Sequence, residues 1–194
     1  MKRKDEFWNV ISPTPPHSMA ADAGLAPARA CGTCTLCCKV MAVQALDKAI
    51  GAWCQHCAPG RGCKIHETRP GECRDFNCLW LGDPKFPEHL RPDRTKVVFV
   101  LEAGGGRVAA YVDPSVPTVW RQGEVYSVLK NLAVQAAQSR RQVVVFVRDA
   151  ATAILPDRDV PLGPVHIGQQ IIYSMRQTPD GPRIEPRVEA LPSA

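Results

Sequence analysis

The sequence predicts an α+β fold, in which a small cysteine-rich, metal-stapled module is followed by a small, mostly antiparallel sheet with one packed helix. Two observations lead to this prediction. All nine cysteines lie between Cys31 and Cys78, and the rest of the 194-residue chain contains none. Beyond residue 96, short apolar runs typical of strands alternate with turns and with one amphipathic stretch.

Four segments are expected along the chain. Residues 1–30 carry four prolines and no periodic apolar pattern, which is typical of a disordered leader. Residues 31–82 form the cysteine module, residues 83–95 a surface linker rich in proline and charge, and residues 96–194 the α+β domain. A module of this size is too short to bury an apolar core of its own, so a metal staple is expected.

Apolar runs predict the strands of the second half. Residues 97–101 and 108–112 flank three consecutive glycines and predict a β-hairpin. The run 142–147, which is apolar throughout after Gln142, predicts a central strand. Further strands are predicted at 152–155, at 170–175 and, after a turn at 178–181, around Ile184.

Helical spacing is strongest between residues 117 and 140. Apolar side chains recur there at i, i+3 and i+4, on one face of the predicted helix, at Val125, Val128, Leu129, Leu132 and Ala136. Within the cysteine module, the apolar residues Val43, Leu46 and Ile50 predict a short helix or turn packed on the metal core.

Composition and charge narrow the classes of function. A hydrophobic fraction of 45% and a charged fraction of 22% are ordinary for a globular protein. The net charge of +5 is mild and spread along the chain, so no nucleic-acid partner is predicted. The basic N-terminus lacks the apolar segment of a secretory signal, and no run of about 18 apolar residues could span a membrane. We therefore expect a cytoplasmic protein with no membrane partner, whereas a protein partner stays open.

The nine cysteines are the candidate metal ligands. Thiols stay reduced in the cytoplasm, so dense cysteines there indicate metal binding or catalysis more often than disulfides. A common zinc-site pattern has two CxxC pairs that are 15–20 residues apart. The pair Cys54–Cys57 meets this pattern with two earlier pairs: it lies 19 residues after Cys31–Cys34 and 16 residues after Cys34–Cys37. Which of the cysteines share an ion stays open. The candidate ligands are Cys31, Cys34, Cys37, Cys38, Cys54, Cys57, Cys63, Cys73 and Cys78.

Two sites of four cysteines would leave one of the nine thiols over. Cys63, Cys73 and Cys78 are natural members of a second site, completed by Cys38 or Cys31. The ninth thiol is expected at Cys38 or, as the second choice, at Cys31, where it would be free and reactive. Zinc is the expected metal because it suits an all-thiolate tetrahedral site. Iron or an iron–sulfur cluster is the alternative, since the first three cysteines are spaced as in the opening of a bacterial ferredoxin motif.

The module resembles a bacterial family of zinc- or iron-chelating domains named for its CxxCxxCC signature. The run Cys31-Gly-Thr-Cys34-Thr-Leu-Cys37-Cys38 matches that signature, and residues 62–78 match the second block of the family. His66 stands where many relatives have tyrosine, which argues against an essential histidine ligand there. The resemblance covers roughly a quarter of the chain and implies metal chelation in small cytosolic proteins. Some members are flagellin lysine methylases with iron–sulfur chemistry, but nothing after residue 82 carries that activity over.

Three functions are predicted, in order of preference. The first is a metal-binding protein that acts by interaction or metal handling, the second an iron–sulfur protein in electron transfer or in a protein-modifying enzyme, and the third a thiol redox sensor. No catalytic arrangement is recognised, so catalysis is not favoured. The arginines of the module, Arg61, Arg69 and Arg74, are expected either to balance the negative charge of the thiolates or to form ordinary salt bridges. Its aromatic residues, Trp53, Phe76 and Trp80, are expected to shield the site from water.

Overall fold

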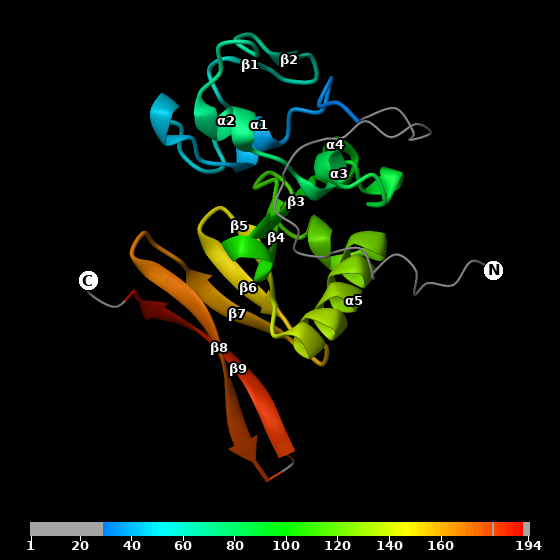
Figure 1. Cartoon of the computed structure of the whole chain (residues 1–194), viewed down its shortest axis with the longest axis vertical. Helices are drawn as coiled ribbons and strands as arrows, with labels where there is room; N and C mark the ends of the chain where they lie inside the picture. Colours follow the sequence, from blue (N-terminus) through cyan, green and yellow to red (C-terminus); the bar gives the residue numbers. More distant parts are fainter. Residues whose placement is uncertain (1–28, 180, 192–194) are drawn as a thin grey trace, which may run out of the picture.

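A computed structural model describes residues 29–179 and 181–191 of the chain. The cysteine module lies at one end, a five-stranded sheet with one long helix lies in the middle, and a two-stranded hairpin extends from the other end (Figure 1). The predicted α+β class is confirmed. Apart from its last two residues, the leader expected at 1–30 falls outside the described residues.

Short elements joined by turns build the cysteine module, and the longest of them has five residues. The short helix or turn expected around 43–50 is a single 3-10 turn that ends at Asp47, which adopts a left-handed backbone conformation. The elements are α1 (Cys37–Val40), η2 (Gln44–Leu46), β1 (Cys57–Ala58), β2 (Gly62–Cys63), α2 (Gly71–Asp75) and α3 (Leu79–Gly82).

The central sheet has the strand order β3-β4-β5-β6-β7. Neighbouring strands are antiparallel except β4 and β5, which run parallel because the helix α5 (Gly123–Ser139) connects them. The predicted hairpin is β3–β4 with its glycine turn, and the predicted central strand is β5, so both predictions are confirmed. The strands are β3 (Val97–Glu102), β4 (Arg107–Val112), β5 (Gln142–Val147), β6 (Ala150–Ile154) and β7 (Asp159–Pro164), with the turns η4 (Ala103–Gly105) and η5 (Val119–Arg121).

Strand β7 was not predicted from the sequence. It contains Pro161 and Pro164, and proline cannot donate a backbone hydrogen bond to a neighbouring strand. The strand is found at the end of the sheet order, where one side of its backbone needs no partner. An edge position therefore explains how a proline-containing segment joins the sheet.

Successive side chains of each strand point to opposite faces of the sheet, so each face of the sheet has its own buried core. On one face, Val97 and Phe99 of β3 pack with Leu129 and Leu132 of α5, and the buried face of that helix is the predicted one. On the other face, Val98 and Val100 pack against the buried Leu36 and Val40 of the cysteine module. The module therefore rests on the sheet through a shared apolar contact.

Residues 83–95, expected to be a surface linker, also contribute to the core. They form η3 (Glu88–Leu90) and α4 (Pro92–Thr95), and both Phe86 and Leu90 are buried against the α5 side of the sheet. The rings of Phe86 and Phe99 lie with their centroids 5.5 Å apart. Arg29 holds this segment in place by donating hydrogen bonds to the carbonyl oxygens of Trp80 and Phe86, each at 2.7 Å.

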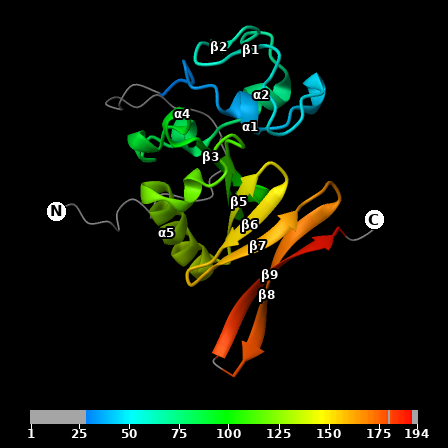
Figure 2. The ribbon, with the colours of Figure 1, turned by 180° about the vertical axis from the view of Figure 1, so that it is seen from behind.

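The C-terminal hairpin consists of β8 (Gln169–Thr178) and β9 (Gly181–Ala190). Ile171 and Tyr173 of β8 and Val188 of β9 pack over Val144 and Phe146 on the sheet face opposite α5. The tip of the hairpin extends away from the body (Figure 2). Among the described residues, no helix has the length and apolar character that a membrane crossing requires.

Candidate metal centre

All nine cysteines are free thiols, and eight of them line two adjoining cavities of the module. Cys57 lines neither cavity but lies beside Cys38 and Cys54, whereas Cys31, Cys34 and Cys37 line both cavities. We call the first group the inner cluster, because apolar side chains enclose it where the module meets the sheet. The second group, the outer cluster, lies at a wider cavity. The inner cluster is Cys31, Cys34, Cys37 and Cys78, and the outer cluster is Cys38, Cys54, Cys57, Cys63 and Cys73.

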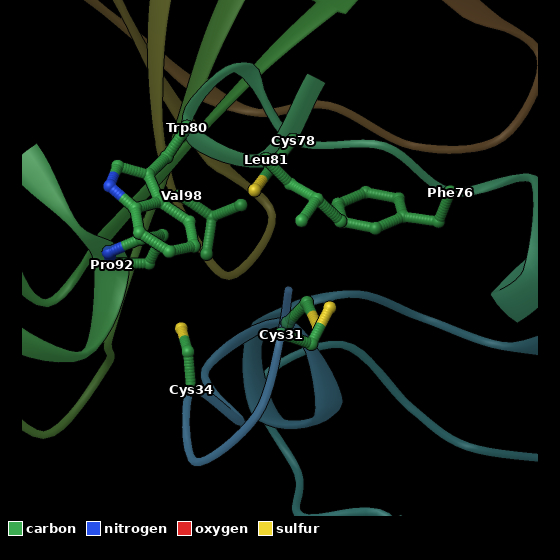
Figure 3. A pocket seen from close by; sticks show the side chains of 9 residues that line it. Cys31, Cys34, Phe76, Cys78, Trp80, Leu81, Pro92 and Val98 are labelled. Atoms are coloured by element: carbon green, nitrogen blue, oxygen red, sulfur yellow. The ribbon is translucent and has the colours of Figure 1, made fainter. Parts of the chain in front are cut away.

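The inner cluster surrounds a cavity of about 20 Å³. The sulfur atoms of Cys31 and Cys34 lie on one side of this cavity and that of Cys78 on the other (Figure 3). Phe76 and Trp80 line the cavity together with Leu81, Pro92 and Val98. A volume of this size holds one water-sized particle, so the space fits a single ion. Cys31 is exposed, so the cavity is open to solvent on that side.

The path of the backbone explains how the inner cluster assembles. Cys34 donates its N–H to the carbonyl oxygen of Cys31 at 2.7 Å, which closes the tight turn that a CxxC pair requires. Cys78 directly precedes α3, whose Trp80 is buried in the core. Because α3 packs against β3, Cys78 is brought next to the first cysteines of the module although it lies far along the chain.

The outer cluster is assembled by hydrogen bonds of both backbone and side chains. The N–H of Cys54 donates to the carbonyl oxygen of Cys38 at 2.9 Å, and that of Cys57 donates to Cys54 at 3.0 Å. Side-chain hydrogen bonds link Cys57 to Cys38 and to Thr35, and they link Cys38 to Cys37. Cys38 therefore lies between the two clusters.

Without a cation, the protein environment favours the neutral thiol at several of these cysteines. Burial raises the pKa of Cys57 to about 11, and the neighbouring Cys38 contributes to the same shift. The hydrogen bond to Cys37, together with burial, raises the pKa of Cys38 well above its usual range. Burial likewise raises the pKa of Cys73 and Cys78. A metal ion would reverse this balance, because it stabilises the thiolate directly.

Cationic side chains surround the outer cluster. Its cavity has a volume of about 930 Å³ and is lined by Arg61, Arg69, Arg74 and Lys48. Lys48 is buried, and its ammonium group donates to the carbonyl oxygens of Lys39 and Ala49, each at 3.1 Å, and to that of Met41. It thereby ties the end of α1 to the loop that leads to the Cys54–Cys57 pair.

One buried ion pair anchors the helix that carries Cys37 and Cys38. Lys39 of α1 donates to the carboxylate of Asp113 at 2.6 Å and to the hydroxyl of Ser115 at 2.6 Å. Burial acts to raise the pKa of Asp113, but the hydrogen bonds from Lys39 and Ser115 outweigh it and lower the pKa. The position of α1 is therefore fixed relative to the end of β4.

The donor set and the space fit a thiolate-bound metal, although the ligand geometry is not closed. Within residues 29–179 and 181–191, no three His, Cys, Asp or Glu side chains converge closely enough to hold an ion. Four thiols around a cavity of about 20 Å³ nevertheless match a tetrahedral all-thiolate site in number and chemistry. Closure requires the thiols to lose their protons and turn toward the ion, which is the coupling expected between metal binding and folding.

The grouping of the thiols differs in part from the one favoured by their spacing. Cys78 joins Cys31 and Cys34 and not Cys63 and Cys73. Cys38, expected as the spare thiol, is hydrogen-bonded to Cys37 and to Cys57, and which thiol is spare stays a prediction. The three arginines, for which charge balance and ordinary salt bridges were both open, line the outer cavity, and Phe76 and Trp80 line the inner one. Trp53 is 44% exposed and does not line either cavity.

Comparisons of the chain with protein-family models, with curated proteins and with solved structures found no match. The resemblance of the module to the CxxCxxCC chelating family therefore stays a prediction, which rests on the cysteine spacing and on residues 62–78. The fold and the site together define an α+β protein whose thiol-rich module is packed on a mostly antiparallel sheet.

Proposed function

We propose that this protein binds metal ions through its cysteine module, with zinc as the preferred ion and iron as the alternative, and that it acts in metal handling or by interaction with another protein. One observation carries the proposal: eight of the nine free thiols, from separate stretches of the module, line two adjoining cavities, and the ninth, Cys57, lies beside Cys38 and Cys54. So many free thiols suit a reducing compartment such as the cytoplasm.

The inner cluster supports a structural ion. Its four thiols equal the number of ligands that zinc takes in a structural site, and its small cavity leaves room for one ion. The enclosing side chains, among them Phe76, Trp80 and Val98, would keep water from competing for the metal. Because Val98 belongs to the sheet, an ion at this position would also strengthen the contact between module and sheet.

The charges around the outer cluster support a second site. A zinc ion with four thiolates carries a net charge of about −2, which must be offset where the site is partly buried. Lys48, Arg61, Arg69 and Arg74 supply positive charge around this cavity, opposed by Glu72 and Asp75. The cationic excess is the kind of lining that a thiolate-bound metal requires.

An iron–sulfur cluster is the second candidate, and the size of the outer cavity favours it. A volume of about 930 Å³ with several thiols on its walls has room for several iron and sulfide atoms, whereas the inner cavity has not. Such a protein would act in electron transfer or as part of a protein-modifying enzyme. The colour of the isolated protein separates the two candidates.

Anaerobic purification followed by metal analysis and a visible spectrum tests the proposal. We expect a colourless protein with two zinc ions per chain, whereas a brown protein with iron and sulfide would favour the second candidate. Cys34→Ser should remove the inner ion and Cys73→Ser the outer one. Thr33→Ser, an exposed change beside Cys34 that leaves every thiol in place, is the matched control. If the wild-type chain holds no metal, or if both cysteine variants keep its full metal content, the proposal is wrong.

A further inference from the structure

Cys57 and Cys63 face each other across the two-stranded ribbon β1–β2. They are direct partners in its antiparallel register, and the N–H of Lys64 donates to the carbonyl oxygen of His56 at 2.8 Å beside them. This pattern places the two cysteines at a non-hydrogen-bonded position, where Cα atoms lie about 4.5 Å apart and both side chains project from the same face. A disulfide bond tolerates Cα separations of about 4.4–6.8 Å. The backbone therefore already has the spacing that a disulfide needs.

The two thiols differ in their surroundings. Cys57 is only 8% exposed and is hydrogen-bonded to Cys38 and Thr35, within the group that also contains Cys54. Cys63 is half-buried and lines the wide outer cavity, which Cys57 does not. Since a tetrahedral ion takes four ligands and the outer cluster holds five thiols, one thiol is left over. Cys63 shares the cavity wall with Cys38, Cys54 and Cys73, so within the Cys57–Cys63 pair it is the thiol that an oxidant can reach. We take Cys63 as the spare thiol and Cys57 as a ligand.

We propose that Cys57 and Cys63 are a redox pair that closes a disulfide on reaction with a small-molecule disulfide such as oxidised glutathione, and that closure releases the ion of the outer cluster. The release rests on the proposed function, because it requires a bound metal. The disulfide itself rests only on the ribbon register and on the access that the outer cavity gives to Cys63.

The chemistry balances in two exchanges. The Cys63 thiolate attacks one sulfur of oxidised glutathione, forms a mixed disulfide and expels one glutathione thiolate. The Cys57 thiolate then attacks the Cys63 sulfur, its bond to the metal breaks, and the second glutathione thiolate leaves. Two electrons pass from the cysteine pair to oxidised glutathione. Both cysteines react as thiolates, so the two glutathione thiolates take up their protons from the solvent. Cys38, Cys54 and Cys73 would then be the three outer-cluster thiols left to hold an ion, and a competing chelator would remove it.

The experiment starts from the full chain loaded with zinc and measured for metal. Oxidised glutathione is added in the presence of a chromogenic zinc chelator, and the products are digested with trypsin and mapped by mass spectrometry. Cleavage after Lys48, Arg61 and Lys64 separates Cys57, in peptide 49–61, from Cys63, in peptide 62–64. We expect one of two zinc ions to be released first, together with a link between these peptides that fragmentation assigns to Cys57 and not to Cys54.

Two variants complete the test. Cys63→Ser should lose both the link and the oxidant-triggered release of bound zinc, while Thr33→Ser should behave as the wild-type chain. A link that joins other cysteines, or zinc release from Cys63→Ser at the wild-type rate, overturns the inference. If the chain holds no zinc at the outset, the proposed function has failed and the peptide map of the metal-free chain alone decides whether the cysteine pair closes.

Discussion

Replacing Leu90 by alanine tests whether the module and the sheet share one core. Leu90 lies in the segment between them, is 1% exposed and packs with side chains from α3, β3 and α5. Leu191, near the C-terminal end of the chain, is 51% exposed and provides a matched control for the same chemical change. Only the buried substitution removes contacts on which both halves depend.

The expected effect is large for Leu90→Ala and small for Leu191→Ala. Truncating a buried leucine destabilises a protein by about 2–5 kcal/mol, because apolar contacts are lost and a cavity remains. For a chain of this length, 1 kcal/mol corresponds to a shift in Tm of about 2–4 °C. Leu90→Ala should therefore lower Tm by roughly 4–20 °C, whereas the exposed change should stay within about 0.5 kcal/mol of the wild type.

Thermal unfolding of the metal-loaded protein provides the measurement. Circular dichroism follows the sheet, and release of metal to a chelator follows the module. A shared core requires both signals to move together to the lower midpoint in Leu90→Ala. The reasoning would be refuted if the sheet kept its wild-type Tm while the module melted earlier, or if both leucine variants behaved alike.

Three further predictions follow from the same contacts. Asp113→Asn should destabilise the protein by about 1–3 kcal/mol in urea unfolding, because it leaves the half-buried ammonium of Lys39 without its carboxylate. Adding Lys39→Met should recover most of the loss. Equal instability of the single and double variants would contradict this. The second prediction concerns Cys57, whose pKa is about 11 in the folded metal-free protein and about 8.5 in the unfolded chain. A thiol whose pKa is raised by folding stabilises the folded state only while it stays protonated. The metal-free protein should therefore lose stability as the pH rises from about 8.5 to about 11. Circular dichroism melts across that range should show the loss in the wild type and a smaller one in Cys57→Ser. A fragment of residues 94–194 should show no cooperative melt, since it lacks Phe86 and Leu90 and exposes the module-facing side of β3.

Periodicity made much of the sheet domain predictable. The hairpin β3–β4, the central strand β5 and the buried face of α5 all repeat apolar side chains over several residues, so local spacing reports their burial. Phe86 and Leu90 lie among prolines and charges without any period, and only the tertiary path of the chain reveals that they are buried. Strand β7 was missed for a different reason. Its prolines are compatible with a strand only at the edge of a sheet, and the edge position is known only once the whole sheet is assembled.

The candidate site was predictable in its members but not in their grouping. A CxxC spacing reports that two thiols can reach one ion, because the turn between them is local. Which pairs meet depends on contacts made elsewhere. Cys78 joins Cys31 because α3 packs on β3, and Cys38 meets Cys57 because its carbonyl oxygen accepts the N–H of Cys54. Neither contact leaves a trace in the spacing of the cysteines.

The adjacency of Cys37 and Cys38 on α1 has a consequence for metal uptake. Successive helical residues point about 100° apart, so a single helical turn supplies one donor to the inner cluster and one to the outer cluster. Under the proposed function, an ion in either cluster would orient the cysteine that it binds, and the neighbouring cysteine on the same turn would then be held ready for the second ion. Such coupling is reciprocal, so each ion raises the affinity of the other by the same factor. The two sites would therefore bind metal cooperatively, and their occupancy would rise over a narrower range of metal concentration than that of two independent sites. Loss of either ion would lower the affinity of the remaining site for its own ion.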